Sequence, residues 1–305
     1  LSENMRRVLP RASFLAFTGT PLMESEEDQL TRKVFGDYVS TYDFQRAIED
    51  GATVPLYYDN RGDKLGIATD DVNERIAAVV AKHELDQDAE EKLKRELSRE
   101  YPIVTAPGRL DRIAEDLVAH YSKRWLTGKA MLVCLDKITC VKMWELIGKH
   151  WQAEVNRQLA IVDEAADEQE QLARERKLAW LNETRIRVIV SDEQNEGEKF
   201  RRWRDIENKY FEKRGEDWRW EFDIEHHRRL MKENDCEAQF KDDEHPFRIA
   251  IVCAMWLTGF DVPSLSTLYL DKPMKGHTLM QAIARANRVH EGKNNGLLVD
   301  YNGMR

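Results

Sequence analysis

The chain has 305 residues and a mass of 35.7 kDa, a length that favours two domains at about 100–200 residues each. A hydrophobic content of 42% excludes a wholly disordered chain, and a net charge of −9 excludes a uniformly basic protein that coats nucleic acid. Any DNA-binding surface would therefore be confined to a part of the molecule.

The sequence predicts a cytoplasmic protein with no membrane partner. No stretch approaches 18 uninterrupted apolar residues, and the first residues lack both the basic and the apolar region of a secretory signal. The four cysteines have no paired spacing, which is typical of reduced thiols in a core. Because the chain begins without Met and ends directly after a predicted strand, we expect it to be part of a longer protein.

The amino-terminal part of the chain is expected to hold one strand and several helices. Residues 11–22 form an apolar run that ends in a Thr-Gly-Thr-Pro turn, which indicates a strand with a loop at its carboxyl end. Thr41 or Asp43 can cap a helix that begins a few residues later. The elements expected after it are that helix over 44–50, an extended segment at 54–58, and helices within 70–99 and over 110–125.

From residue 126 the pattern changes to that of a covered parallel sheet. Five short apolar runs are continuous rather than alternating, which indicates strands buried on both faces. These runs are residues 129–135, 185–190, 247–253, 267–270 and 296–300. A helix is expected over 137–150, and two long charged blocks at 151–182 and 198–244 predict helical insertions. We therefore expect a doubly wound α/β domain.

A candidate anion site follows the third of these strands. Thr258, Gly259 and Asp261 lie in a Thr-Gly-Phe-Asp turn, and the carboxyl end of a strand is where open α/β sheets bind ligands. Further on, Arg285 and Arg288 are three residues apart on a predicted helix, so they would share a face and could stabilise phosphate charge. The alternative is that both arginines make ordinary surface ion pairs and that Asp261 is a turn residue.

Three ordered motifs resemble those of a known protein family. TGTP at 18–21, TGFD at 258–261 and QAIARANR at 281–288 are similar to motifs III, V and VI of superfamily 2 helicases and translocases. The longer stretches FGDYVSTYDFQRAIEDGATVPLYY at 35–58 and 253–303 resemble more narrowly the restriction (HsdR) subunit of type I restriction–modification enzymes.

The resemblance implies a fold and a domain arrangement. Residues 126–305 would be a second RecA-like lobe, a P-loop NTPase fold with helical insertions, preceded by a helical linker at 23–125. Residues 1–22 would be the end of the first lobe. The intact subunit would hydrolyse ATP between the two lobes, move double-stranded DNA, and cut it with a separate nuclease domain. Its partners would be DNA and the methylation and specificity subunits.

The resemblance also implies roles for single residues. Arg288 would be the arginine finger on the γ-phosphate, with Arg285 as its companion. The residues implied to respond to nucleotide are Gly259, Asp261, Gln281, Thr18 and Thr20, and those implied to contact DNA are Thr258 and Lys275.

The phosphate loop expected of an ATPase site is missing from the sequence. No GxxxxGK[ST] motif occurs, so the phosphate loop and its Mg²⁺-binding hydroxyl would belong to the first lobe, and we expect this chain alone to be inactive. No metal site is expected, because adjacent His226 and His227 point to different sides of a helix.

Another superfamily 2 translocase, or a non-catalytic DNA-binding or scaffold module, remains an alternative function for this chain.

Overall fold

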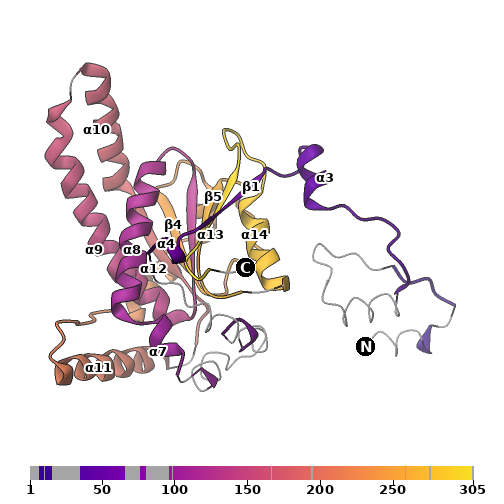
Figure 1. Ribbon diagram of the computed structural model, residues 1–305, viewed down its shortest axis with the longest axis horizontal. Coiled ribbons are helices and arrows are strands. Elements are labelled where there is room, and N and C mark those ends of the chain that lie inside the picture. The colour runs from indigo at the N-terminus through magenta and orange to yellow at the C-terminus, as the bar shows by residue number, and fades with distance from the viewer. Residues whose placement is uncertain are drawn as a thin grey trace.

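The computed structural model describes most of the chain from Phe35 onward (Figure 1). The described residues are 7–9, 11–15, 35–65, 76–79, 96–97, 99–165, 167–193, 195–257, 259–274 and 276–303. Among them, no helix is both long and apolar enough to cross a membrane.

The described residues form one six-stranded sheet in which every pairing is parallel. The strands are β1 (Leu56–Asn60), β2 (Lys129–Cys134), β3 (Arg185–Ile189), β4 (Phe247–Val252), β5 (Leu265–Asp271) and β6 (Gly296–Asp300), and their spatial order is β1-β6-β5-β2-β4-β3. The five strands predicted from continuous apolar runs are thereby confirmed. The extended segment at 54–58, which the sequence assigned to a linker, contributes β1 at the edge of the same sheet.

Helices cover both faces of the sheet, as continuous apolarity required (Figure 1). One face packs against α8 (Pro107–Tyr121) and α9 (Lys137–Ile161), with Leu132, Ile249 and Tyr269 pointing into that core. The other face packs against α13 (Cys236–Lys241) and α14 (Gly276–Ala286). The four cysteines are buried and form no disulfide, which agrees with the expected reduced core thiols.

The first insertion is a helical hairpin that projects from the domain (Figure 1). Asp136 caps α9 by accepting a hydrogen bond from the Thr139 amide at 2.7 Å, and the helix continues for 25 residues, well past the predicted end at 150. The chain then returns through η2 (Val162–Glu164) and α10 (Glu168–Glu183). The indole of Trp151 donates to the Leu181 carbonyl at 3.0 Å, which joins the two helices at their base.

The second insertion wraps around the β3 edge of the sheet. It consists of α11 (Glu196–Arg214), α12 (Ile224–Glu233) and α13. Trp220 is buried in the core on the α9 side and anchors the insertion there. Phe240 of α13 is buried in the core on the opposite side.

The amino-terminal expectations have mixed outcomes. The capped helix is confirmed as α3 (Phe44–Glu49), with Asp43 accepting from the Arg46 amide at 2.9 Å. Of the strand expected at 11–22, residues 11–15 are described and form no strand, and residues 16–22 lie outside the described residues. Residues 76–79 are helical, and most of the helix expected within 70–99 lies outside the described residues. The remaining short helices are α4 (Gly62–Leu65), α7 (Tyr101–Val104) and η1 (Ser122–Arg124).

Candidate phosphate-facing site

The Thr-Gly-Phe-Asp turn lies in a crossover segment, residues 253–264, that joins β4 to β5 without a helix. The segment starts at the carboxyl end of β4 and must reach the amino end of β5, because the two strands run in the same direction. Its last residues are already beside β2, where the Lys129 amide donates to the Ser264 carbonyl at 3.0 Å. Asp261 therefore lies toward the amino edge of the sheet, and the expectation of a site at the carboxyl end was wrong.

Three cationic side chains hold this crossover by its backbone carbonyls. Lys272 donates to the Cys253 carbonyl at 2.9 Å, where the segment begins. Arg285 donates to the Phe260 carbonyl in the middle of the segment. Lys293 donates to the Pro263 carbonyl at 2.9 Å, where the segment ends, and burial lowers its pKa to about 8. The crossover is thus fixed at its start, middle and end.

The guanidinium of Arg285 is occupied by its contacts with backbone carbonyls. It lies in the last turn of α14, where its Nε also donates to the carbonyl of Gln281 at 3.3 Å. Burial and the nearby charge of Arg288 lower the pKa of Arg285, while Asp261 opposes that change. A guanidinium whose donors already bind carbonyls has fewer left for an incoming anion.

Arg288 lies beyond the end of α14, and the expectation that both arginines share one helical face was wrong. The helix ends at Ala286, and Arg288 forms an isolated antiparallel bridge with Thr53. The adjoining Val54 amide donates to the Asn287 carbonyl at 2.8 Å. The chain leaves the helix here because its backbone pairs with the segment that leads into β1.

The side chain of Arg288 is accessible. Its Nε lies 3.4 Å from Oδ1 of Asp261, and the two side chains are 46% and 58% exposed. An ion pair this exposed contributes at most about 1 kcal/mol, so Arg288 can exchange its partner at low cost. Pairing of the Arg288 backbone with the segment before β1 thus accompanies the approach of Arg288 to Asp261.

The other predicted site residues divide into two groups. Gly259 has a φ of +69° with open space around it, which suits the tight turn expected there, and Gln281 lies on α14 one turn before Arg285. Thr18, Thr20, Thr258 and Lys275 lie outside the described residues. Within the described part of the chain, no group of three or more His, Cys, Asp or Glu side chains is arranged to hold a metal ion.

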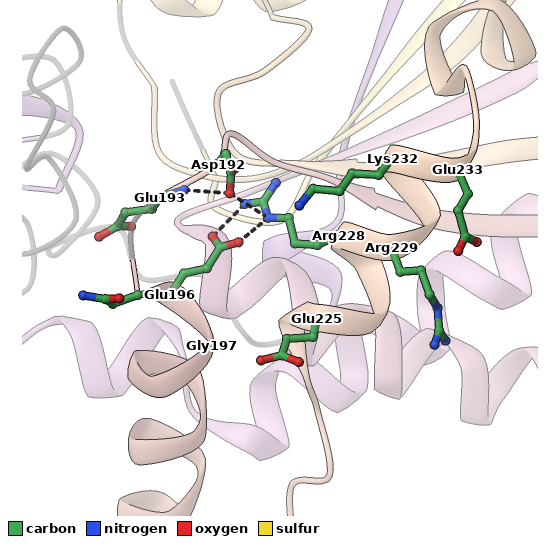
Figure 2. A pocket seen from close by; sticks show the side chains of 10 residues that line it. Asp192, Glu193, Glu196, Gly197, Glu225, Arg228, Arg229, Lys232 and Glu233 are labelled. Carbon is green, nitrogen blue, oxygen red and sulfur yellow. Dashed lines mark hydrogen bonds and ion pairs between the residues drawn. The ribbon is translucent and has the colours of Figure 1, made fainter.

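A separate cavity of about 510 Å³ lies at the carboxyl end of β3, between α11 and α12 (Figure 2). Part of its charged lining is already paired. Arg228 donates to both carboxylate oxygens of Glu196 and to the carbonyls of Val190 and Ser191. These contacts of Arg228 join the second insertion to the end of β3. None of the predicted site residues lines the cavity.

The sequence of this α/β domain matches a known family. Residues 127–303 match the family described as type I restriction enzyme subunit R domain 3. The chain belongs to the type I restriction enzyme R subunit family. In addition, residues 1–91 match the family described as SWI2/SNF2 ATPase.

Relatives of this R-subunit chain are considerably longer. It is 34% identical to the type I restriction enzyme HindI endonuclease subunit of Haemophilus influenzae over 99% of this chain and 24% of that protein. It is 32% identical to the MjaIXP endonuclease subunit of Methanocaldococcus jannaschii over 100% of this chain and again 24% of the relative. The chain thus spans about a quarter of these curated relatives.

A solved structure supports the fold. A fragment described as an HsdR subunit of a type I restriction enzyme from Vibrio vulnificus YJ016 aligns with a TM-score of 0.50 at 16% identity, covering 93% of this chain and 38% of that one. The α/β, RecA-like fold expected for this R-subunit chain is confirmed.

Sequence reasoning missed two residues that hold the crossover. No motif includes Lys293, although it fixes the end of the crossover. Phe240 is far from the motifs in sequence, yet its ring lies against the crossover. No local pattern marks either residue, because both act through contacts between distant parts of the chain.

Proposed function

We propose that this chain is the second motor lobe of a type I restriction enzyme R subunit, and that Arg288 completes the ATPase site when the two lobes close. The observation that carries the proposal is the accessible guanidinium of Arg288, which pairs with the accessible carboxylate of Asp261. On closure, Arg288 exchanges this carboxylate for the γ-phosphate of ATP bound to the upstream lobe. An arginine in this role contributes about 10³–10⁵ in rate.

Arg285 has a different role in this proposal. Its donors hold the Phe260 and Gln281 carbonyls, so it fixes the turn that carries Asp261 and leaves the phosphate to Arg288. It acts through the position of its neighbours and is not a second finger.

The proposal places the phosphate loop and Mg²⁺ on the upstream lobe. The sequence has no GxxxxGK[ST] motif, and the described residues include no group suited to a metal ion. The residues present therefore fit a phosphate-facing arginine and do not fit Mg²⁺. It follows that this chain on its own does not hydrolyse ATP.

The remaining assignments follow from the same proposal. Residues 1–22 end the first lobe, 23–125 form the linker, and 126–305 form the second lobe, to which β1 adds an edge strand. Thr18 and Thr20 respond to nucleotide, and Thr258 and Lys275 contact the DNA backbone. The intact cytoplasmic enzyme would move double-stranded DNA, cut it with a nuclease domain outside this chain, and assemble with methylation and specificity subunits.

One observation favours a second candidate function. Both arginines are already paired within the lobe, Arg285 with a carbonyl and Arg288 with a carboxylate. A non-catalytic DNA-binding or scaffold module would have this arrangement permanently.

ATP hydrolysis separates the two candidates. It is measured with and without double-stranded DNA for this chain, for an R subunit that joins it to an upstream lobe with a phosphate loop, and for that subunit with Arg288→Ala. The motor predicts DNA-stimulated turnover in the subunit, a loss of about a thousandfold in the variant, and none in the chain alone. Turnover that Arg288→Ala leaves unchanged would remove Arg288 as the finger, whereas no turnover in the subunit would favour the module.

A further inference from the structure

Four aromatic rings from two parts of the chain meet beside the crossover. The ring of Phe240 in α13 lies 5.4 Å from that of Trp256 at an interplanar angle of 28°, and 4.8 Å from that of Phe247 at the start of β4. Trp256 in turn stacks on Phe260, with centroids 4.1 Å apart and planes 11° apart. Phe240 is fully buried, so an element of the second insertion forms part of the core beneath the crossover.

The backbone of Trp256 requires this support. Its φ is +68°, in the left-handed region that side chains other than glycine rarely adopt. Such a conformation persists only where surrounding contacts impose it. The rings of Phe240 and Phe260 on the indole supply those contacts.

Helix α13 is itself fixed to the sheet. Lys129, the first residue of β2, donates to the carbonyls of Gln239 and Asp242, the first of these at 3.1 Å. Arg187 of β3 donates to Oε1 of Gln239 at 2.6 Å. Phe240 is therefore held by three strands and presents a fixed surface to the crossover.

The stack continues to the arginines. The carbonyl of Phe260 accepts from Arg285, and the next residue, Asp261, pairs with Arg288. A shift of the Phe260 ring would therefore move both partners of the arginine pair. We infer that Phe240, on the second insertion, is a positioning residue for the ATPase site, because it holds the crossover in the conformation that aligns Arg285 and Arg288.

The inference rests on the proposed function, and it is tested in the same R subunit with its upstream lobe. Phe240→Ala removes the ring and is expected to lower kcat for DNA-stimulated ATP hydrolysis about 10²-fold, the cost of a displacement near 1 Å at a reacting centre. The KM for ATP is expected to change little, since the upstream lobe binds the nucleotide. Phe240→Leu keeps most of the volume and should restore much of the kcat.

A matched control is Phe211→Ala in α11. Phe211 is buried in the same insertion, but it packs into the core on the opposite face of the sheet. Its loss should lower the melting temperature about as much as Phe240→Ala does, with kcat near that of the unmodified protein. Combining Phe240→Ala with Arg285→Ala should lower kcat little beyond Arg285→Ala alone, because both changes release the same turn.

Hydrogen exchange separates this inference from the proposed function. In Phe240→Ala, the amides of residues 253–261 should exchange faster than they do in Phe211→Ala, whether or not the protein hydrolyses ATP. Equal exchange in the two variants, or equal losses of kcat, would overturn the positioning role. Faster exchange together with an Arg288→Ala variant of full activity would retain Phe240 as the support of the crossover and reject the finger.

Discussion

Nε of Arg288 lies 3.4 Å from Oδ1 of Asp261, and both side chains are accessible to solvent. The two residues come from different connections, the β4–β5 crossover and the segment after α14. They meet at the amino edge of the sheet because the crossover returns there before β5 begins. The pair therefore joins the crossover that carries the TGFD motif to the segment in which the QAIARANR motif ends.

The two members of this pair are expected to differ in their effect on activity. Asp261→Asn and Arg288→Ala should each change the free energy of unfolding by no more than about 1 kcal/mol, since the ion pair is exposed. Arg288→Ala should abolish DNA-stimulated turnover in the R subunit, whereas Asp261→Asn should retain more of it. Urea unfolding and steady-state kinetics on both variants check this. Equal losses of turnover would show that Asp261 itself takes part in the chemistry.

Removing Arg109 should be strongly destabilising. Its Nη1 lies 2.7 Å from Oδ1 of Asp271, and both side chains are almost fully buried. Arg109→Met leaves a buried carboxylate without its cation, at a cost of about 3–5 kcal/mol measured by urea unfolding. Adding Asp271→Asn should recover part of this loss.

The cost of Arg109→Met should also depend on pH. Burial raises the pKa of Asp271 even with Arg109 beside it, and Asp300 adds to that rise. A carboxyl group whose pKa is raised in the folded state stabilises that state at low pH. This stabilisation is lost as the pH rises. The penalty of Arg109→Met should therefore shrink in acid, and a penalty that stays constant with pH would contradict the ion pair.

Stability should fall between about pH 6.5 and pH 4. Burial lowers the pKa of His120 and of His227 to about 4 from the ordinary 6.5. A histidine whose pKa is lower in the folded state than in the unfolded state stabilises the fold at pH values above its unfolded-state pKa. This contribution is lost as the pH falls toward its folded-state pKa. His227→Leu should make the dependence of unfolding free energy on pH shallower in that window and leave it unchanged above pH 7. An identical slope in the variant would argue against a buried neutral His227.

Gly296 should not tolerate a side chain. A Cβ there would overlap the carbonyl oxygen of Ala286 and lie 2.9 Å from Cδ1 of Leu56. Gly296→Ala must push the end of α14 away from β6, so we expect a loss of about 1–3 kcal/mol in thermal unfolding. The control is Gly148→Ala in α9, where the space is open and the change should be neutral or stabilising. Equal melting temperatures in the two variants would contradict the close approach of α14 to β6.

Much of the fold could be predicted from local pattern. Continuous apolar runs predicted five of the six strands, β2 to β6, since a strand buried on both faces must be apolar at every position. The edge strand β1 was recognised only as extended, because Tyr57 and Tyr58 are exposed and its pairing with β6 joins residues about 240 apart. The end of α9 was misplaced because its helical pattern continues without a stop signal at 150.

The candidate site was predicted in composition but not in geometry. The motifs identified Asp261, Arg285 and Arg288, yet the spacing of three implied one helix face. The helix ends at Ala286 because the following backbone pairs with Thr53, a contact that no local rule anticipates. The support from Phe240 was missed for the same reason, since it depends on how an insertion folds back across the sheet.

The unbroken course of α9 has a mechanical consequence. Its first turn is capped beside the end of β2 and buried in the core, and its last turns extend into the projecting hairpin. At 1.5 Å per residue its 25 residues span roughly 37 Å. One end of the helix is anchored in the domain. A small rotation of the domain therefore displaces the tip of the hairpin by a larger distance.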